Sequence, residues 1–427
     1  MNKLFTYEQF LVEKELRNTE LQSIMEGGAA GHMSHPFDDK GLTFGDFKKL
    51  VEAGLKGELN FEEDATEKTD GQNVFATIQD GEVKFSRNKT ELKEPMDLPT
   101  FKNKFEGHKS KLVQDTFQLA AEDLAKQLSK LSAKDQQIFA NGKNFMNMEL
   151  IYSKNPNVIR YDRDVIQFHG IKETDGEGNI IGDVKGSAKA VADALAKVEA
   201  TIGDTFTIIP PQIIKLGKDL NFEQNKKKFL NKIEELRKRY NLTDADEVSR
   251  YHEMWWREQI EENFGDLPQD IKEGLLLRWA YEDKKTLNMR SLAKMITKEQ
   301  AAAVKKFDKE DVSKKYKENI RPFEDLFLEL GSIILKNASN FVAANPDAEM
   351  QRLHKELRDE AEKIRKSGDI SKIEKVESEL ARLDRIGGIE SIIPSEGLVF
   401  MYKGKIYKLT GTFAAINQLM GIIKYGR

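Results

Sequence analysis

A lysine, an aspartate and a glycine stand close together in "EKTDGQNV", residues 67 to 74, directly before a segment with the pattern of a β-strand. In an extended chain Lys68 and Asp70 project to the same side, and Gly71 lets a ligand approach the backbone. A lysine attacks phosphorus only when it is neutral, so its pKa must fall by roughly three units from about 10.4. Cationic neighbours or a metal could supply that shift. The alternative is a solvated lysine where a strand begins.

Two hairpins and two further strands are predicted around this segment. The first hairpin is "NVFATIQDGEVKFSRNK", in which Asp80-Gly81 tolerates the positive φ angles of a type I′ turn. The second is "ESIIPSEGLVFMYKGKIYKLTG", turned at Lys403-Gly404. "FMNMELIY" and "RDVIQFHGI" are typical of single strands, and residues 101–138 carry apolar residues at helical spacing. On an extended "FMNMELIY", Glu149 and Asn147 share a polar face and three apolar side chains take the other, as the wall of a pocket requires.

Between about residues 185 and 387 the sequence changes to helical patterns, for example in "SAKAVADALAKVEATI" and "FLNKIEELRKRYNL". Strands on both sides of a helical block predict an α+β protein. We expect a core of antiparallel sheets with flanking helices and a large inserted all-α domain. The expected division is an N-terminal helix and loop segment (1–60), two parts of the core (61–184 and 388–427) and the helical insert (185–387).

The composition restricts the function only broadly. The chain has 427 residues, 39% of them hydrophobic, which is enough for two domains with ordinary cores. Its formal charge of -4 means that any nucleic-acid contact must come from local basic patches. The absence of cysteine excludes disulfides and thiolate nucleophiles and favours a reducing compartment. Because no eighteen successive residues are apolar, we expect a cytoplasmic protein that does not cross a membrane.

Six short patches occur in an order typical of one enzyme superfamily. They are "KTDG" (68–71), "SRNK" (86–89), "NMELIY" (147–152), "IQFHGI" (166–171), "SEGLVF" (395–400) and "IYKLTG" (406–411). In this order and strand context they resemble the motifs of the covalent nucleotidyltransferase superfamily, which comprises ATP-dependent polynucleotide ligases and capping enzymes and is expected to have an ATP-grasp-like ligase core. The resemblance is closest to the RNA ligase branch, where a glutamate such as Glu67 often precedes the lysine.

The resemblance implies a role for each motif. Lys68 is the nucleophile, Arg87 contacts ribose or the polynucleotide, and Glu149 contacts the ribose hydroxyls. Phe168 stacks on the base, and Glu396 serves the metal and the phosphates. For the lysine that binds the α-phosphate, Lys408 is expected and Lys403 and Lys405 are alternatives. The expected catalytic residues are Lys68, Asp70 and Lys408, the expected cofactor-binding residues are Glu67, Gly71, Arg87, Glu149, Phe168 and Lys408, and the expected metal ligands are Glu396 and Glu149.

The implied reaction uses ATP with Mg²⁺ or Mn²⁺ and has three steps. Lys68 forms a lysyl-AMP, the AMP moves to a polynucleotide 5′-phosphate, and a 3′-hydroxyl attacks to seal the strand and release AMP. DNA ligases and capping enzymes usually carry an OB-fold after the last motif, and residues 411–427 are too few for one. This favours an RNA ligase, with RNA rather than DNA as partner. A DNA ligase, a guanylyltransferase and a non-catalytic nucleotide-binding scaffold remain alternatives.

The helical insert has two interpretations. Its segment "NKKKFLNKIEELRKRY", with Trp255 and Trp256, could bind a nucleic-acid backbone and stack a base. Acidic residues interrupt every basic run, which favours lysines in solvent and tryptophans in a helical core. A protein partner of the insert is also possible.

The N-terminal stretch "GGAAGHMSHPFDD" contains a second group of candidate ligands. His32, His35, Asp38 and Asp39 could form a metal or phosphate site that covers the pyrophosphate or the acceptor end. A flexible loop before the helix "TFGDFKKLVEAGL" is the alternative. His169, beside Phe168, is expected to be a wall residue rather than a base.

Overall fold

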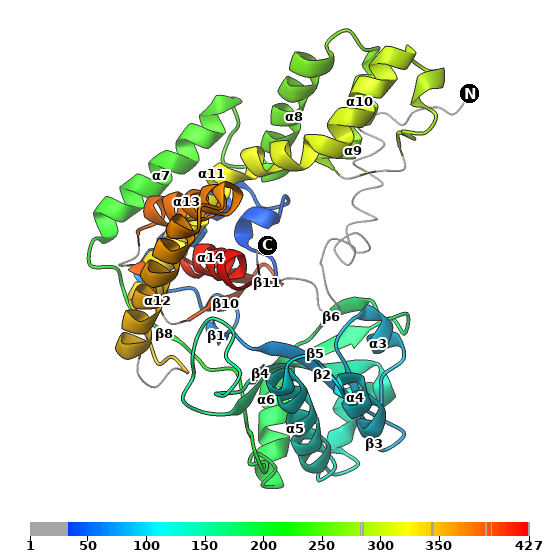
Figure 1. Ribbon diagram of the computed structural model, residues 1–427, viewed down its shortest axis with the longest axis vertical. Coiled ribbons are helices and arrows are strands. Elements are labelled where there is room, and N and C mark those ends of the chain that lie inside the picture. The colour runs from blue at the N-terminus through cyan, green and yellow to red at the C-terminus, as the bar shows by residue number, and fades with distance from the viewer. Residues whose placement is uncertain are drawn as a thin grey trace. The chain divides into compact units, whose positions relative to one another are not determined.

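The computed structural model describes residues 33–281, 283, 286–342, 346–388, 391–393 and 395–425. Helices and antiparallel strands are mixed along this part of the chain, which confirms the α+β class (Figure 1). The chain forms two compact units. One contains residues 34–58 and 218–330, and the other contains residues 59–217 and 331–425.

These units divide the chain differently from the expected boundaries. Residues 185–217 and 331–387 were expected in the helical insert, but they belong to the unit that holds both β-sheets. Residues 34–58 were expected as a separate segment, but they belong to the helical unit. An amphipathic helix shows the same sequence period whichever core it packs against, so periodicity does not reveal its partner.

The larger unit is built on two sheets. One has the strand order β3-β2-β4-β5-β6, with β7 paired to β5 in parallel, and the other has the order β1-β10-β11 (Figure 1). β8 and β9 form a separate pair. The strands are β1 (Thr66–Lys68), β2 (Gln72–Gln79), β3 (Glu82–Ser86), β4 (Asn144–Ile151), β5 (Val165–Thr174), β6 (Ile180–Val184), β7 (Thr207–Ile209), β8 (Lys215–Leu216), β9 (Ala338–Ser339), β10 (Gly397–Tyr402) and β11 (Lys405–Leu409).

Both predicted hairpin turns are confirmed. Asp80 and Gly81 have φ angles of 52° and 79°, and Lys403 and Gly404 have φ angles of 52° and 73°. A type I′ turn requires positive φ at both central residues, and its twist matches that of the flanking strands. The turns therefore set the register of β2 with β3 and of β10 with β11.

Helices cover the apolar face of the larger sheet. The side chains of Met146, Met148 and Leu150 on β4 lie in this core, so the predicted apolar face of the strand is confirmed. They pack with Phe117 of α5 and with neighbouring aromatic and aliphatic residues. The elements on this part of the chain are α3 (Lys89–Lys93), α4 (Leu98–Phe105), α5 (Lys111–Leu128), η2 (Asp135–Gly142) and α6 (Ser187–Lys197).

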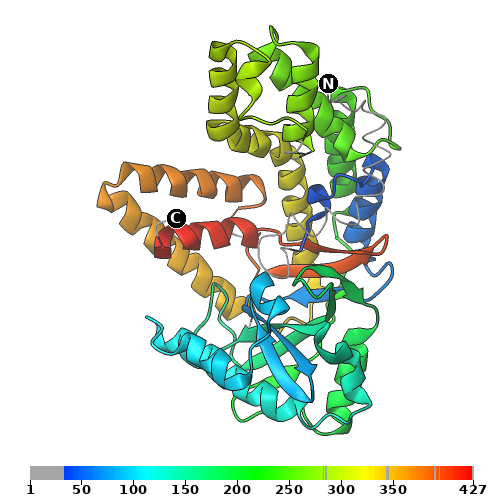
Figure 2. The ribbon, with the colours of Figure 1, turned by 90° about the vertical axis from the view of Figure 1, so that its right-hand side faces the viewer.

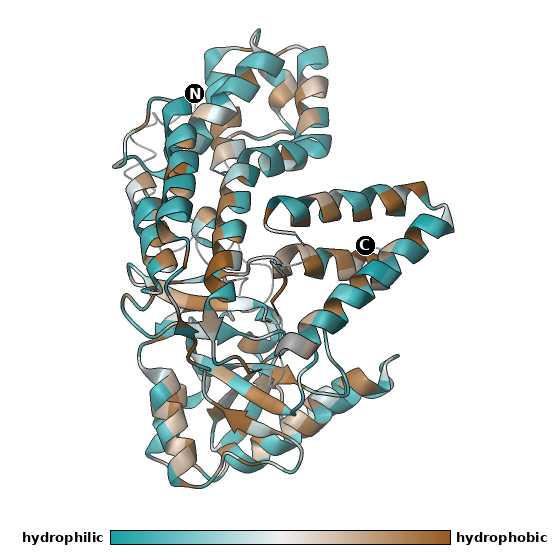
Figure 3. Cartoon of the chain, turned by 90° about the vertical axis from the view of Figure 1, so that its left-hand side faces the viewer, coloured by the Kyte–Doolittle hydropathy of each residue, from teal (hydrophilic) through white to brown (hydrophobic). Residues whose placement is uncertain are grey.

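Three more helices belong to the same unit. α12 (Pro346–Ser367) and α13 (Ile370–Arg385) form the helical hairpin that their charge pattern predicted, and Asp369 caps α13 through a hydrogen bond from the Lys372 N–H at 3.1 Å. α14 (Phe413–Tyr425) lies between them (Figure 2). α14 is mostly apolar, whereas α12 and α13 alternate between polar and apolar residues (Figure 3).

The smaller unit is helical and has an aromatic core. Trp255, Trp256 and Trp279 are buried there with Phe264 and Phe307. The prediction that the tryptophans fill a helical core is therefore confirmed, and they are not free to stack on a base. The elements of this unit are η1 (Pro36–Asp38), α2 (Phe44–Lys56), α7 (Phe222–Arg239), α8 (Val248–Phe264), α9 (Gln269–Ala280), η3 (Leu292–Lys294), α10 (Lys298–Glu310) and the first part of α11 (Val312–Lys336).

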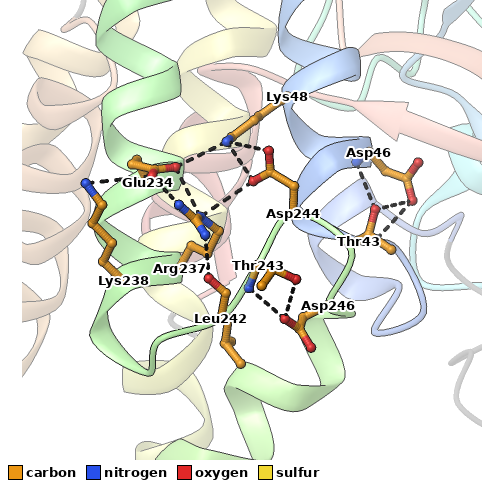
Figure 4. A network of polar contacts seen from close by, with 10 residues as sticks. All are labelled: Thr43, Asp46, Lys48, Glu234, Arg237, Lys238, Leu242, Thr243, Asp244 and Asp246. Carbon is orange, nitrogen blue, oxygen red and sulfur yellow. Dashed lines mark hydrogen bonds and ion pairs between the residues drawn. The ribbon is translucent and has the colours of Figure 1, made fainter.

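Polar contacts join α2 to α7 within this unit (Figure 4). Lys48 of α2 donates to Glu234 of α7 at 3.1 Å and to Asp244 at 2.7 Å. Arg237 of α7 donates to the Leu242 carbonyl at 2.5 Å and so holds the turn after the helix. The lysines and arginines here pair with acidic neighbours, as the interrupted basic runs suggested. Within the described part of the chain, no helix is both long and apolar enough to cross a membrane.

We expect Trp256→Ala to destabilise the helical unit by about 3–5 kcal/mol, because it leaves a large cavity in a core where Trp256 is 1% exposed. Urea unfolding followed by far-ultraviolet circular dichroism measures this loss. Leu220→Ala is the control, because Leu220 is 93% exposed and should change the stability by less than about 0.5 kcal/mol. Equal effects of the two substitutions would contradict the assigned core.

Candidate active site

Lys68 lies at the end of β1, directly opposite Gly397 at the start of β10. This pairing brings the preceding Glu396 to the lysine, and the two side chains form an ion pair. Both are mostly buried, with 18% and 17% of their side-chain surface exposed. The strand pairing therefore brings together "KTDG" and "SEGLVF", the first and the fifth of the six sequence patches.

Gly397 is the residue that allows this approach. A Cβ atom at this position would lie 2.2 Å from the Leu409 carbonyl oxygen of β11. Such a contact is far shorter than van der Waals distance, so any side chain here would force β10 and β11 apart. The glycine after Glu396 is required for the sheet that positions the ion pair.

Asp70 anchors the segment after Lys68. Its carboxylate accepts hydrogen bonds from the backbone N–H groups of Val158 and Ile159 at 2.7 and 2.8 Å. Its own N–H donates to the Tyr161 hydroxyl at 3.0 Å. Burial and the nearby negative charge of Glu396 raise the pKa of Asp70 to about 6. Asp70 therefore lies beside Lys68, but it also holds a backbone loop in place.

Gly71 brings the start of β2 against β4. A Cβ atom there would lie 2.9 Å from the Leu150 carbonyl oxygen and 3.1 Å from Oε2 of Glu149. The space that was expected to admit a ligand is thus filled by Glu149. A small pocket borders Asp70 and Gly71 on the side of Asn157 and Tyr161, and Lys68 does not line it.

Glu149 completes a cluster of three carboxylates around Lys68, which we call the carboxylate cluster (Asp70, Glu149 and Glu396). Burial raises the pKa of Glu149 to about 8, the positive charge of Lys68 opposes this rise, and the charges of Glu396 and Asp70 add to it. These mutual effects show that the three acids and the lysine occupy one site. As predicted, Glu149 and Asn147 lie on the face of β4 opposite the core.

The groups whose charges act on Lys68 are the expected carboxylates. Burial acts to lower its pKa, but the carboxylates of Glu396, Glu149 and Asp70 outweigh burial and raise it above the usual value. The cationic neighbours that could have lowered the pKa of Lys68 are not among the groups that act on it. These carboxylates therefore favour the ammonium form of Lys68.

Arg87 lies at the edge of this cluster. Its guanidinium stacks 4.1 Å from the centre of the Phe117 ring, and its Nε donates to the Asn73 carbonyl at 3.2 Å. Asn73 is the β2 residue directly opposite Glu149. Burial lowers the pKa of Arg87, and the charges of Glu91 and Glu149 oppose that effect. Because the charge of Glu149 acts on it, Arg87, which was an expected site residue, lies near the cluster.

Lys408 projects from the same face of the small sheet as Lys68. Lys408 lies opposite Val399, which is two residues from Gly397, the partner of Lys68. Side chains two residues apart on a strand share a face. Lys405 lies opposite Tyr402 and therefore projects from the other face. Of the two, Lys408 is the lysine that the register brings to the face of Lys68, while Lys403 lies in the turn.

Two expected site residues lie elsewhere. Phe168 is opposite Met148, is 1% exposed and belongs to the hydrophobic core on the face away from Glu149. Glu67 alternates with Lys68 along β1, and its carboxylate accepts a hydrogen bond from the Val342 N–H at 2.5 Å. Strand alternation is the reason in both cases: an error of one residue exchanges the faces. The expected stacking role of Phe168 is incompatible with this position.

Gln167, which precedes Phe168, was not among the expected site residues, but the strand register places it beside Glu149. Gln167 lies directly opposite Glu149, so it shares the site face. His169 follows Phe168 next to a bulge in the register of β5, and burial, with the charges of Lys68 and Lys172, lowers its pKa to about 3. His169 is therefore a neutral wall residue near Lys68, as expected. The alternation of "IQFHGI" carried the signal, because neighbouring strand residues face opposite ways.

The N-terminal candidates form local turn contacts. Asp38 accepts a hydrogen bond from the His35 N–H at 2.8 Å, and Asp39 accepts one from the Gly41 N–H at 2.9 Å. His32 lies outside the described residues. Across the described ranges, no group of three histidine, aspartate or glutamate side chains is arranged to hold a metal ion.

Helix α12 supports the loop that holds Asp70. Glu349 accepts a hydrogen bond from the Arg160 N–H at 2.8 Å, and Arg352 donates to the Val158 carbonyl at 2.8 Å. Arg352 also donates to Glu349 from its Nε at 2.8 Å, so the two side chains brace each other. The loop is thus fixed by α12 on one side and by Asp70 on the other.

Comparison of the chain with protein-family models, with curated proteins and with solved structures found no match.

We expect Arg352→Ala to loosen the loop of residues 158–161, because it removes the donor to the Val158 carbonyl and the partner of Glu349. Hydrogen exchange of the Val158 and Ile159 amides should speed up about 10- to 100-fold, which corresponds to the loss of one or two hydrogen bonds. Lys355→Ala, an exposed lysine on the same helix, is the control. Unchanged exchange in the arginine variant would show that α12 does not hold the loop.

The stability of the protein should depend on pH through the buried carboxyl group of Glu67. Burial raises the pKa of Glu67 to about 7 although the Val342 N–H favours its charged form. Between pH 4.5 and 7, Glu67 is therefore protonated in the folded protein but ionised in the unfolded chain, where its pKa is near 4.5. Because the folded state binds the extra proton, the free energy of unfolding falls as the pH rises from about 4.5 to 7. Glu67→Gln should be more stable than the wild type at pH 8, by on the order of 2 kcal/mol, with little difference at pH 4.

Denaturant unfolding of both proteins at the two pH values measures this difference. The glutamine oxygen can still accept the Val342 N–H, so the comparison isolates the charge. The same difference at pH 4 and at pH 8 would refute the assignment.

Proposed function

We propose that the protein is an ATP-dependent polynucleotide ligase, an RNA ligase in preference to a DNA ligase, with a nucleotidyltransferase core. The observation that carries the proposal is the convergence of the separate sequence motifs. Lys68, Asp70, Glu149 and Glu396 come from both ends of the larger unit and interact in one mostly buried cluster. Chance strand residues would not be expected to meet in this way.

Buried polar atoms without partners support a ligand at this site. Within the described part of the chain, the Gln167 amide and the Thr410 hydroxyl are buried and lack hydrogen-bond partners. Gln167 shares the face of Glu149, and Thr410 lies two residues after Lys408. Buried polar groups are normally paired, so such groups at a site indicate that a ligand completes them. Their neutral donors and acceptors suit a nucleotide.

The first chemical step follows from the ion pair. Lys68 must lose a proton before its Nζ can attack the α-phosphorus of ATP. Glu396 is its direct partner and is the group that would accept the proton. The Nζ–P bond then forms as the bond from the α-phosphorus to the pyrophosphate oxygen breaks in line. The products are an AMP joined to Lys68 by a phosphoramidate bond, and pyrophosphate.

The other cluster residues have supporting roles in this proposal. Lys408, on the face of Lys68, would stabilise charge on the α-phosphate, and Glu149 and Arg87 would contact the ribose. Mg²⁺ or Mn²⁺ would be held by Glu396 or Glu149 together with phosphate oxygens, and its charge would offset the carboxylates that raise the pKa of Lys68. A metal that takes ligands from the substrate is consistent with the lack of a complete protein site in the described residues.

The later steps rest on the sequence resemblance. The adenylyl group would pass to a polynucleotide 5′-phosphate, and a 3′-hydroxyl would then release AMP and seal the strand. We propose RNA as the preferred nucleic acid, the cytoplasm as the location and a protein partner for the helical insert (185–387). One observation favours a second function. The ammonium form of Lys68, held by carboxylates, also suits a non-catalytic protein that binds nucleotide reversibly.

We expect the protein to become labelled by α-labelled ATP with magnesium and to keep an acid-labile AMP on Lys68 after denaturation. Lys68→Ala should lose the label because it removes the amine that is proposed to bind the AMP. Lys134→Ala, which removes an exposed lysine of the same unit, should retain it. Mass analysis of peptides identifies the modified residue.

The result separates the candidate functions. Label from GTP alone would indicate a guanylyltransferase. No label from either nucleotide, in folded protein that is not already adenylylated, would favour the reversible binding protein. If the adduct forms, nicked RNA and nicked DNA are the substrates to compare.

A further inference from the structure

The side chain of Gln167 has an unusual environment for an amide. It is 0% exposed, and neither its Nε2 nor its Oε1 has a hydrogen-bond partner in the residues that the structure describes. Leaving both groups of a buried amide unpaired is costly, because each has lost its hydrogen bonds to water. An amide in such a position is explained if a ligand pairs with it.

The strand register directs this amide to the proposed nucleotide site. Gln167 lies opposite Glu149 on β4 and opposite Ile209 on β7, so it stands in the middle of the sheet. Its neighbour Phe168 points into the core, which confirms that Gln167 points the other way. Glu149 in turn interacts electrostatically with Lys68. Gln167 therefore lies beside Glu149, on the same face of the sheet and on the neighbouring strand.

The charges identify the part of a nucleotide that suits this position. The phosphates belong near the cationic groups, Lys68 and Lys408, which lie on the small sheet. Gln167 lies on the other sheet and is neutral, and His169, two residues further along the same strand, is also neutral. A neutral, hydrogen-bonding group beside the proposed ribose contact matches the base rather than the phosphates.

We propose that the Gln167 carboxamide binds the base edge that carries an exocyclic amine beside a ring nitrogen, and thereby makes the site prefer adenine; this inference rests on the proposed function. The Oε1 atom accepts a hydrogen bond from the amine, and the Nε2 atom donates to the ring nitrogen. This is the bidentate pairing by which glutamine recognises adenine in nucleic acids. It would satisfy both orphaned atoms at once.

The test uses equilibrium binding, so that it does not depend on catalysis. Full-length Lys68→Ala protein, which cannot form the adduct, is titrated by calorimetry with ATP and with purine riboside triphosphate, which lacks the exocyclic amine. ATP should bind about 10- to 100-fold more tightly, the discrimination given by a bidentate base contact. In the Lys68→Ala/Gln167→Met protein this ratio should fall to near one. Lys68→Ala/Gln114→Leu, which removes a half-buried amide on α5, should keep it.

A stability measurement separates ligand recognition from a structural role. Methionine has a similar volume and no unpaired polar group, so Gln167→Met should raise the melting temperature of the nucleotide-free protein. A lower melting temperature would show that the amide already has a structural partner and would overturn the proposal. Equal binding of ATP and purine riboside triphosphate, tighter binding of GTP than of ATP, or no nucleotide binding would also overturn it. Base discrimination without any covalent label in the wild type would sustain this inference and reject the ligase.

Discussion

The candidate site depends on one constraint: a lysine is buried among three carboxylates. An isolated buried ammonium would be strongly unfavourable, and the ion pair with Glu396 and the charges of Asp70 and Glu149 make it tolerable. The acids in turn repel one another, which adds to burial in raising the pKa values of Asp70 and Glu149. Removing any one of the four side chains leaves the charges of the other three without compensation. The cluster is therefore a coupled unit and not four independent residues.

This balance also bears on reactivity. A nucleophilic lysine needs a low pKa, yet the carboxylates around Lys68 raise its pKa. Under the proposed function, the cluster keeps the lysine inactive until a cation and a nucleotide arrive. The negative charge that holds the ammonium form is then the charge that attracts the metal. The carboxylates that stabilise the Lys68 ammonium before the nucleotide binds would then serve as metal ligands or as proton acceptors.

The backbone around the cluster is held by parts of the chain that are distant in sequence. The first strand of the small sheet comes from near residue 66, and its other two strands come after residue 396. Asp70 is tied to the loop of residues 158–161, and Glu349 and Arg352 of α12 bind that loop from the other side. α12 is therefore part of the structure that supports the site, although its sequence alone indicated only an exposed charged helix. This explains why it belongs to the unit that contains the sheets.

Local sequence determined much of this protein. The two type I′ turns, the strands of "FMNMELIY" and "RDVIQFHGI", the helical hairpin of α12 and α13, and the buried tryptophans all follow from short-range patterns, because turn geometry and periodicity depend on neighbouring residues. The polar face of β4 with Glu149 was predictable for the same reason. Only the tertiary structure decided which helices belong to which unit, which charges surround Lys68, and that Gln167 rather than Phe168 faces the site. These properties depend on strand pairing and burial between residues far apart in the chain, and a one-residue change of register reverses a face without changing the local pattern.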